Sequence, residues 1–175
     1  MNARETRRLV KRQYNAIFFA FVLIFALIAL HFYLRPEAGP KEGLYKIDYV
    51  SDGDTLIVDI EGEKKFVRLI GIDCPESVHP DETKNTPEGK LAAEHTRELA
   101  AGHSCYLEYD SVTIDDYGRT LAYVWLDDGT FLNEQILADG YAELLTIPPN
   151  VRYSNRFQKA YHQAREEGKG LFQKN

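Results

Sequence analysis

The chain has 175 residues, of which 44% are hydrophobic and 27% are charged, and its formal net charge is −6 at pH 7. This composition is ordinary for a globular protein, so it excludes a mainly disordered chain and predicts one domain with a short appendage. The acidic balance also excludes the broad basic surface by which proteins bind polyanions non-specifically. Any chemistry on a nucleic acid would therefore need a local site with its own cation.

The first predicted element is an apolar helix. An uncharged stretch of 22 residues, from Gln13 to Leu34, separates Arg12 from Arg35. A helix of about 20 residues crosses a hydrocarbon layer of ~30 Å. We therefore predict a transmembrane signal anchor over residues 13–34. A cleaved secretory signal peptide is the alternative, although its apolar stretch is usually shorter and ends in a small-residue cleavage site.

The charge around this segment predicts its orientation. Residues 1–12 contain five basic side chains and one acidic side chain, and positively charged flanks stay in the cytoplasm. We expect a single-pass protein of the cell membrane, with a cytoplasmic N-terminus and an extracytoplasmic domain. Residues 35–43 (RPEAGPKEG) would be a short linker, and the domain would occupy residues 44–175.

The rest of the chain contains strand-like and helix-like segments. Runs rich in β-branched and aromatic residues predict strands at 44–50, 55–60, 64–72, 104–110 and 120–126. Helical spacing of apolar residues and capping signals predict helices at about 87–101, 131–139 and 154–167. Thr86 suits the N-cap of the first helix, Pro87 its first position and Gly102 its end. This order predicts an α+β, mainly β domain, in which a small five-stranded barrel carries three helices.

The cysteines and histidines exclude one class of site. Two cysteines and five histidines show no spacing typical of metal ligands, so a zinc hydrolase is not expected. Cys74 and Cys105 would pair as a disulfide only in an oxidising compartment, and free thiols are the preferred interpretation.

Two carboxylates lie in the predicted turn Asp52-Gly53-Asp54-Thr55, between the first two strands. Asp and Gly are ordinary turn residues, so a purely structural role is one interpretation. The other is a cation site, because carboxylates on a tight turn are good ligands for Ca²⁺.

Arg68 lies in the middle of the predicted strand 64–72, in which both faces are apolar. A guanidinium in such a strand is costly to bury unless it meets an anion. A buried ion pair, a stem that reaches solvent and a contact with phosphate all remain open for this residue.

Two further motifs complete a set of reactive groups. The strand 64–72 continues into Asp73-Cys74-Pro75-Glu76, and Tyr117-Gly118-Arg119 forms a turn before the last strand. Alone, the first motif is an ordinary acidic loop, and the arginine of the second would usually be solvated. Together with Asp54 and Arg68, they supply what phosphodiester hydrolysis requires: cation ligands, a carboxylate that deprotonates water, and fixed donors for the phosphate oxygens.

The motifs also occur in an order that resembles a known family. D-G-D-T, F-V-R-L-I-G-I-D-C-P-E, D-D-Y-G-R-T-L-A-Y and N-E-Q-I-L-A-D-G-Y-A resemble the staphylococcal nuclease (thermonuclease) family over about residues 45–172. The resemblance implies an OB-fold-like barrel with three helices. It also implies a Ca²⁺-dependent endonuclease that hydrolyses single-stranded DNA and RNA. The 5′-oxygen would be the leaving group, and the products would carry a 3′-phosphate.

The resemblance implies a role for individual residues. Asp54, Asp73 and the backbone carbonyl of Cys74 would hold Ca²⁺, Glu76 would orient or deprotonate the attacking water, Arg68 and Arg119 would grip the phosphate, and Tyr117 would contact substrate phosphate. Arg119 would also stabilise the departing 5′-oxygen by its charge, because an arginine hardly ever gives up its proton. DNA and RNA are the expected partners, and no protein partner is predicted.

The sequence departs from the family at three places. Cys74 stands where Thr is common, Asp116 stands where the best-known member has Lys, and the segment 144–150 (LLTIPPN) lacks the tyrosines that line the base pocket in that member. Base stacking is typically worth about 1–3 kcal/mol per base, so base preference and affinity are expected to differ.

Two other classes of protein compete with this interpretation. A non-catalytic module that binds nucleic acid or protein would use the same barrel but would typically replace the Asp, Glu and Arg residues, which this chain retains. A Ca²⁺-stabilised structural domain would use the carboxylates but would not need Arg68 and Arg119. The nuclease interpretation is preferred because it uses every member of the set.

Overall fold

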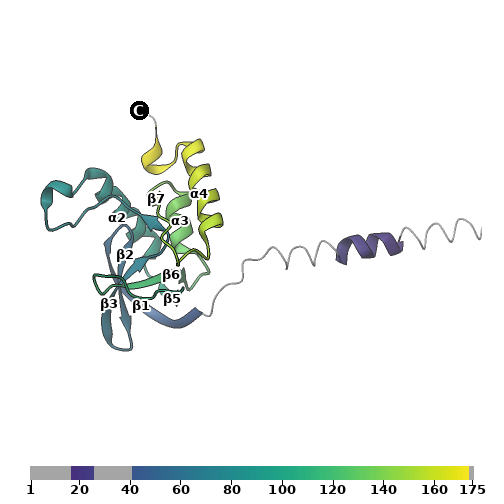
Figure 1. Ribbon diagram of the computed structural model, residues 1–175, viewed down its shortest axis with the longest axis horizontal. Coiled ribbons are helices and arrows are strands. Elements are labelled where there is room, and N and C mark those ends of the chain that lie inside the picture. Colours follow the sequence, from purple (N-terminus) through teal and green to yellow (C-terminus); the bar gives the residue numbers. More distant parts are fainter. Residues whose placement is uncertain (1–16, 26–40, 174–175) are drawn as a thin grey trace, which may run out of the picture. The chain divides into compact units, whose positions relative to one another are not determined.

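The computed structural model describes residues 17–25 and 41–173. By its internal contacts the chain divides into two units, residues 1–37 and residues 38–175. Within the first unit, residues 17–25 are helical. All strands and the remaining helices described below belong to the second unit (Figure 1).

The predicted membrane location is corrected by this structure. Among residues 17–25 and 41–173, no helix is both long and apolar enough to cross a bilayer. The helical residues 17–25 span roughly 13 Å at about 1.5 Å per residue, whereas the hydrocarbon layer is about 30 Å thick. The expectation of a single-pass membrane protein with an extracytoplasmic domain is therefore wrong by this finding. The other parts of the predicted anchor, residues 13–16 and 26–34, lie outside the described residues.

Five strands close into a barrel, as predicted. The barrel strands are β1 (Lys41–Asp52), β2 (Thr55–Ile60), β3 (Glu63–Leu69), β5 (Ser104–Glu108) and β6 (Thr120–Leu126). Their order around the barrel is β1-β2-β3-β6-β5, and β5 pairs back with β1. Only the β3–β6 pairing is parallel among these neighbours. This parallel pairing places the end of β3 beside the start of β6, where the predicted arginines lie.

The described residues of this unit contain three α-helices, again as predicted. They are α2 (Pro87–Ala100), α3 (Leu132–Ala138) and α4 (Ser154–Glu167), accompanied by the 3₁₀ turns η1 (Glu82–Lys84) and η2 (Gly170–Phe172). The Thr86 hydroxyl accepts a hydrogen bond from the Gly89 N–H at 2.9 Å, and Pro87 is the first helical residue. The expected N-terminal signals of α2 are therefore confirmed. Helices α3 and α4 pack side by side (Figure 1).

The predicted strand 64–72 is broken into two strands. Strand β3 ends at Leu69, and the chain turns before β4 (Ile72–Asp73), which pairs with β7 (Glu143–Leu144). Gly71 has φ +87°, and a Cβ at this position would overlap the Phe157 ring. A left-handed backbone and a close aromatic neighbour therefore require glycine here. The turn directs Asp73 back toward the end of β3.

The core fills the barrel and the space under the helices. The largest fully buried side chains include Leu56, Val58, Leu69, Leu107, Tyr123, Leu132, Ile136, Tyr153 and Phe157. Along β2 and β3, buried Leu56, Val58, Val67 and Leu69 alternate with residues on the outer face. Both cysteines are free and buried, so the Cys74–Cys105 disulfide is not formed.

Candidate active site

The turn between β1 and β2 buries a carboxylate that reaches the next layer of the structure. Asp54 is 7% exposed. Its Oδ1 accepts from the Thr55 hydroxyl at 2.9 Å, and its Oδ2 accepts from the Cys74 N–H at 2.9 Å. The Thr96 hydroxyl on α2 donates to the Gly53 carbonyl at 2.7 Å. Helix α2 therefore fixes the turn, and the turn fixes the chain that follows β4.

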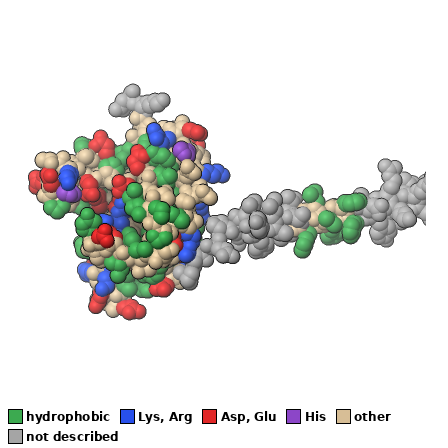
Figure 2. Space-filling view, viewed as in Figure 1, with side chains coloured by type: hydrophobic (Ala, Val, Ile, Leu, Met, Phe, Trp, Pro, Cys, Tyr) green, Lys and Arg blue, Asp and Glu red, His purple; other side chains and the backbone are tan. Residues whose placement is uncertain are grey.

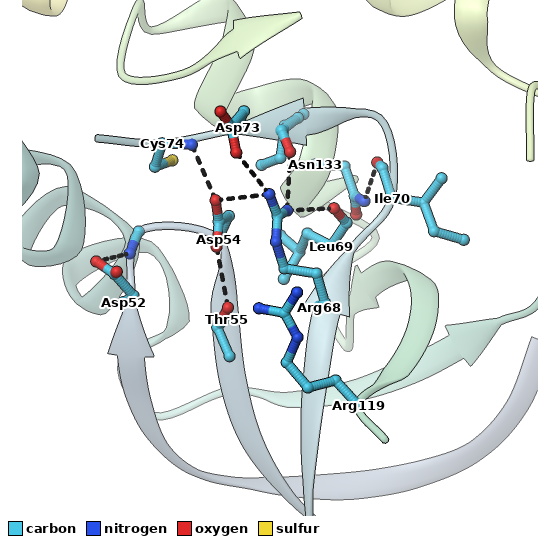
Figure 3. A network of polar contacts seen from close by, with 12 residues as sticks. Asp52, Asp54, Thr55, Arg68, Leu69, Ile70, Asp73, Cys74, Arg119 and Asn133 are labelled. Atoms are coloured by element: carbon cyan, nitrogen blue, oxygen red, sulfur yellow. Dashed lines mark hydrogen bonds and ion pairs between the residues drawn. The ribbon is translucent and has the colours of Figure 1, made fainter. Parts of the chain in front are cut away.

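Arg68 connects Asp54 to a second carboxylate (Figure 3). Its Nη1 donates to the carbonyls of Leu69 and Ile72 at 2.9 and 2.8 Å. Its Nη2 donates to Asp73 Oδ1 at 2.8 Å and lies 3.0 Å from Asp54 Oδ2. Of the three open interpretations, the buried ion pair is the contact present. One guanidinium nitrogen therefore touches two carboxylates that are 19 positions apart in the chain.

The pKa of Asp54 reflects its burial. Burial raises the pKa of Asp54 above its usual value, and the charge of Arg68 and the Cys74 N–H oppose this shift without cancelling it. Asp73 differs, because its side chain is 58% exposed. A cation at this edge would meet one buried carboxylate that is short of compensating charge and one accessible carboxylate.

Glu76 lies on a loop that α2 supports. The Thr86 N–H donates to the Glu76 carbonyl at 2.9 Å, and a Cβ on Gly89 would collide with the same carbonyl oxygen. The first turn of α2 can therefore approach the loop only because residue 89 is glycine. The Glu76 side chain itself is exposed. Burial, followed by the charges of Asp52 and Asp54, raises the pKa of Glu76.

Asp52, the second carboxylate of the predicted turn, is a neighbour of the site to which the family resemblance gives no individual role. It is 8% exposed, and its Oδ1 accepts from the Ser77 hydroxyl at 2.7 Å and from the Gly53 N–H at 2.8 Å. The Asp52 carboxylate thus holds the loop beyond Glu76 and adds negative charge beside it. Its position in the turn was visible in the sequence, but the partner Ser77 is 25 residues away.

Arg119 is held by a residue that the sequence analysis did not single out. Its Nε donates to Asp115 Oδ2 at 2.7 Å, while the N–H groups of Tyr117 and Arg119 donate to Asp115 Oδ1 at 3.0 and 2.9 Å. Burial raises the pKa of Asp115, but the hydrogen bonds and charge of Arg119 outweigh it and lower that pKa overall. Figure 3 shows the Arg119 guanidinium directed toward Arg68. An aspartate four residues before an arginine, across a turn, was the available sequence signal.

The two arginines border one cavity. A pocket of about 340 Å³ is lined by Arg68, Arg119 and Tyr117 at its polar side. Its other walls are mainly apolar and include Leu121, Leu145, Ile147, Pro148 and Pro149, with Asp116 among the remaining lining residues. Tyr117 is 86% exposed. The cavity therefore offers guanidinium groups next to a surface that suits a flat organic ring.

The donor set at Asp54 and Asp73 suits a hard cation. Within the part of the chain that the structure describes, no three His, Cys, Asp or Glu side chains are grouped as a metal cluster. Two carboxylates and the Cys74 backbone carbonyl are oxygen donors, which is the donor type that Ca²⁺ and Mg²⁺ take together with water. The Cys74 side chain instead packs beside Gly53 and close to Ala92. The residues present therefore fit an oxygen-ligated ion rather than a thiolate site.

Comparison with known proteins points to one family. Residues 66–174 match the family described as staphylococcal nuclease homologue. The chain is 38% identical over 160 residues to the thermonuclease of Staphylococcus hyicus, covering 86% of this chain and 94% of that protein. It is 35% identical to the thermonuclease of Staphylococcus intermedius, covering 87% and 95%. It is also 32% identical to endonuclease YncB of Bacillus subtilis (strain 168), covering 73% and 61%.

Proposed function

Because the chain belongs to the family of staphylococcal nuclease homologues and is a hydrolase of nucleic acid ester bonds, we propose that it is a Ca²⁺-dependent endonuclease. Its substrates would be single-stranded DNA and RNA, cleaved between phosphorus and the 5′-oxygen. One observation supports this proposal most directly: Arg68 Nη2 lies between Asp54 and Asp73 while the same residue borders a cavity with Arg119. The proposed cation ligands and the proposed phosphate donors thus lie at one edge of the barrel.

The carboxylates of Asp54 and Asp73 and the carbonyl of Cys74 would hold Ca²⁺. A bound divalent cation would neutralise charge on the reacting phosphate. Asp54 supports this assignment because its buried carboxylate has a raised pKa, which an adjacent positive charge would lower. Arg68 keeps the two carboxylates together through its Nη2 contacts.

Glu76 would take a proton from the attacking water. Its side chain is exposed to solvent, and its raised pKa makes the carboxylate a stronger base than an ordinary glutamate. The charges of Asp52 and Asp54, which contribute to this shift, come from the same turn that carries the proposed metal ligand. The loop that carries Glu76 is fixed through its backbone, so the carboxylate is positioned without being enclosed.

Arg119 would bind the phosphate and stabilise the departing oxygen. The Asp115 carboxylate accepts its Nε–H and so orients the guanidinium, whose Nη groups are directed toward Arg68. Two such groups can donate in parallel to phosphate oxygens. Charge stabilisation rather than proton donation is expected, because arginine keeps its proton. Departure of the 5′-oxygen leaves the phosphate on the 3′-oxygen of the upstream fragment and gives the downstream fragment a free 5′-hydroxyl. Tyr117 would contact substrate phosphate.

A fluorogenic single-stranded oligonucleotide tests this function. We expect cleavage when Ca²⁺ is added and loss of cleavage with excess chelator, with recovery when Ca²⁺ is restored. Mass spectrometry of the fragments should show 3′-phosphate ends. Cleavage that is unaffected by chelator would contradict the metal assignment, and 5′-phosphate ends would contradict the assigned leaving group.

A further inference from the structure

The outer face of the barrel carries two exposed aromatic rings. Tyr49 on β1 and Phe66 on β3 are 54% and 51% exposed, and each is paired in the sheet with Ile57 on β2. Directly paired residues of antiparallel strands point to the same face. Tyr49, Ile57 and Phe66 therefore form a row across three adjacent strands, which we call the aromatic row. In Figure 2, apolar side chains are visible on the surface of this domain beside charged ones.

The aromatic row continues directly from the candidate active site. Phe66 and Arg68 are two residues apart on β3 with the fully buried Val67 between them, so their side chains lie on the same face of the sheet. Phe66 is 51% exposed on this face, whereas Arg68 is 9% exposed beneath its carboxylate and carbonyl partners. Two residues of a strand rise about 6.8 Å, and each nucleotide of one stacked strand rises about 3.4 Å along the helix axis. A polynucleotide with a phosphate at Arg68 would therefore place a base within one or two nucleotides over Phe66.

Ile57, at the centre of the aromatic row, is nearly buried although it lies on the outer face of the sheet. Its side chain points outward, yet it is only 3% exposed, and it does not belong to the main core cluster. Its neighbours in the sheet are the two aromatic residues. A nearly buried aliphatic side chain at the position between the two aromatic residues makes the row one continuous apolar strip, whereas scattered exposed apolar residues would need no explanation.

The charges next to the row favour stacking over a phosphate contact. Lys64, the next outward position on β3, forms an ion pair with Asp48 and lies close enough to Tyr49 for the two to interact electrostatically. Its charge is therefore largely compensated. What remains available to a ligand is the face of two aromatic rings, on which any unpaired base can stack.

We propose that the aromatic row is a second nucleotide-binding subsite. Bases of a single-stranded polynucleotide stack on Phe66 and Tyr49 while the scissile phosphate lies at Arg68 and Arg119. This inference rests on the proposed nuclease function and adds to it a preference for long over short substrates. Bases stacked inside a duplex present no free face, so the subsite also favours single strands over duplexes.

The test compares a short and a long substrate. The short one is a thymidine p-nitrophenyl phosphodiester, and the long one is an oligothymidylate of about 12 nucleotides, within the range that barrels of this type bind. Removing one stacking ring by Phe66→Ala or Tyr49→Ala should lower the ratio of kcat/KM, long over short, by about tenfold. Phe66→Tyr should keep the ratio. Leu91→Ala, which removes an exposed apolar side chain from α2, is the matched control and should also keep it.

Binding separates this inference from the proposed function. Affinity for the labelled oligothymidylate is measured by fluorescence anisotropy in a Glu76→Gln background. Phe66→Ala should lower this affinity about tenfold. The dependence of affinity on salt concentration should not change, because no phosphate contact is removed. Phe66→Leu keeps the apolar volume and should also lose affinity, so a folding defect cannot explain the result. If the wild-type protein cleaves neither substrate but binding depends on Phe66, the proposed function fails and the subsite stands. Unchanged kcat/KM ratios and unchanged affinities in the Phe66 and Tyr49 variants would overturn the proposed subsite.

Discussion

Two buried carboxylates of this barrel are both paired with arginine, but their surroundings differ. Glu108 on β5 is fully buried and accepts from Trp125 Nε1 at 2.9 Å, from Arg152 Nη1 at 2.8 Å and from the Tyr153 hydroxyl at 2.9 Å. Asp54 is joined through Arg68 to Asp73, whose side chain is 58% exposed. The carboxylate of the first network is enclosed by its donors, and this network reaches the surface only through its arginine, Arg152, whose side chain is 31% exposed. The second network exposes a carboxylate. We call the first the closed network and the second the open network. A buried carboxylate becomes a candidate cation site only where an exposed carboxylate of the same network lets the ion reach it.

Two buried tyrosines, Tyr153 and Tyr123, donate hydrogen bonds to carboxylates in and beside the closed network. Burial, together with the hydrogen bond to Glu108, raises the pKa of Tyr153. Burial, together with the hydrogen bond to Asp110, likewise raises the pKa of Tyr123. Both hydroxyls therefore stay protonated as donors throughout the pH range in which the protein would work. A carboxylate surrounded by permanent donors therefore stabilises the fold.

The largest expected effect comes from removing the proposed reactive side chains beside the open network. Glu76→Gln and Arg119→Ala should each lower turnover by about 10²–10⁴, because one removes the proposed base and the other the proposed phosphate donors. The free energy of unfolding should change little, since both side chains are at least partly exposed. Steady-state cleavage rates and urea unfolding measure the two quantities. Glu94→Gln and Arg97→Ala on α2 are the matched controls, and a turnover near the wild-type value in either active-site variant would refute the assigned role.

Breaking the closed network should give the opposite result. Glu108→Ala leaves Arg152 and two hydroxyl or indole donors without their buried acceptor, which should cost about 3–5 kcal/mol of stability. Urea unfolding at low temperature measures this loss. The rate per folded molecule should stay close to wild type, because Glu108 is not part of the cavity bordered by the arginines. A loss below about 1 kcal/mol would show that the closed network contributes little to stability.

Metal binding should stabilise only the open network. At a Ca²⁺ concentration about 100 times the Kd, the free energy of unfolding should rise by about 2.7 kcal/mol. Asp54→Asn removes a proposed ligand and should abolish this rise, whereas Glu94→Gln should retain it. Thermal unfolding with Ca²⁺ and with chelator is the measurement. An equal Ca²⁺-dependent shift of Tm in wild type and Asp54→Asn would place the ion elsewhere.

The smallest expected effect concerns a partly exposed ion pair, His103 with Asp127. The His103 ring lies 2.5 Å from Asp127 Oδ1, and this hydrogen bond raises the pKa of His103 above its ordinary value of 6.5. The stabilising contribution of the pair is therefore fully present below pH 6.5 and is lost as the pH rises through the folded-state pKa. We expect a small fall in Tm across this window, which His103→Gln should remove. An identical pH profile for the variant would show that solvent cancels the pair entirely.

Local patterns determined most of the fold. The predicted strands 55–60 and 120–126 and the predicted helix 154–167 have the same bounds in the structure, because each is marked by apolar spacing and end signals within its own segment. The candidate site residues were also found from short motifs, since ligand types and their spacing are local. Composition was less informative for residues 13–34, where an apolar run alone predicted a span that the described helices do not provide.

Tertiary structure alone decided how these pieces meet. Asp54 bonds to the N–H of a residue 20 positions later, Asp52 to Ser77 after 25, and Glu108 to Arg152 after 44. The break of the predicted strand at Gly71 depends on the Phe157 ring from α4. The aromatic row depends on sheet register, because pairing decides which side chains share a face. Sequence patterns state what a segment prefers, whereas contacts between distant segments arise only when the barrel closes.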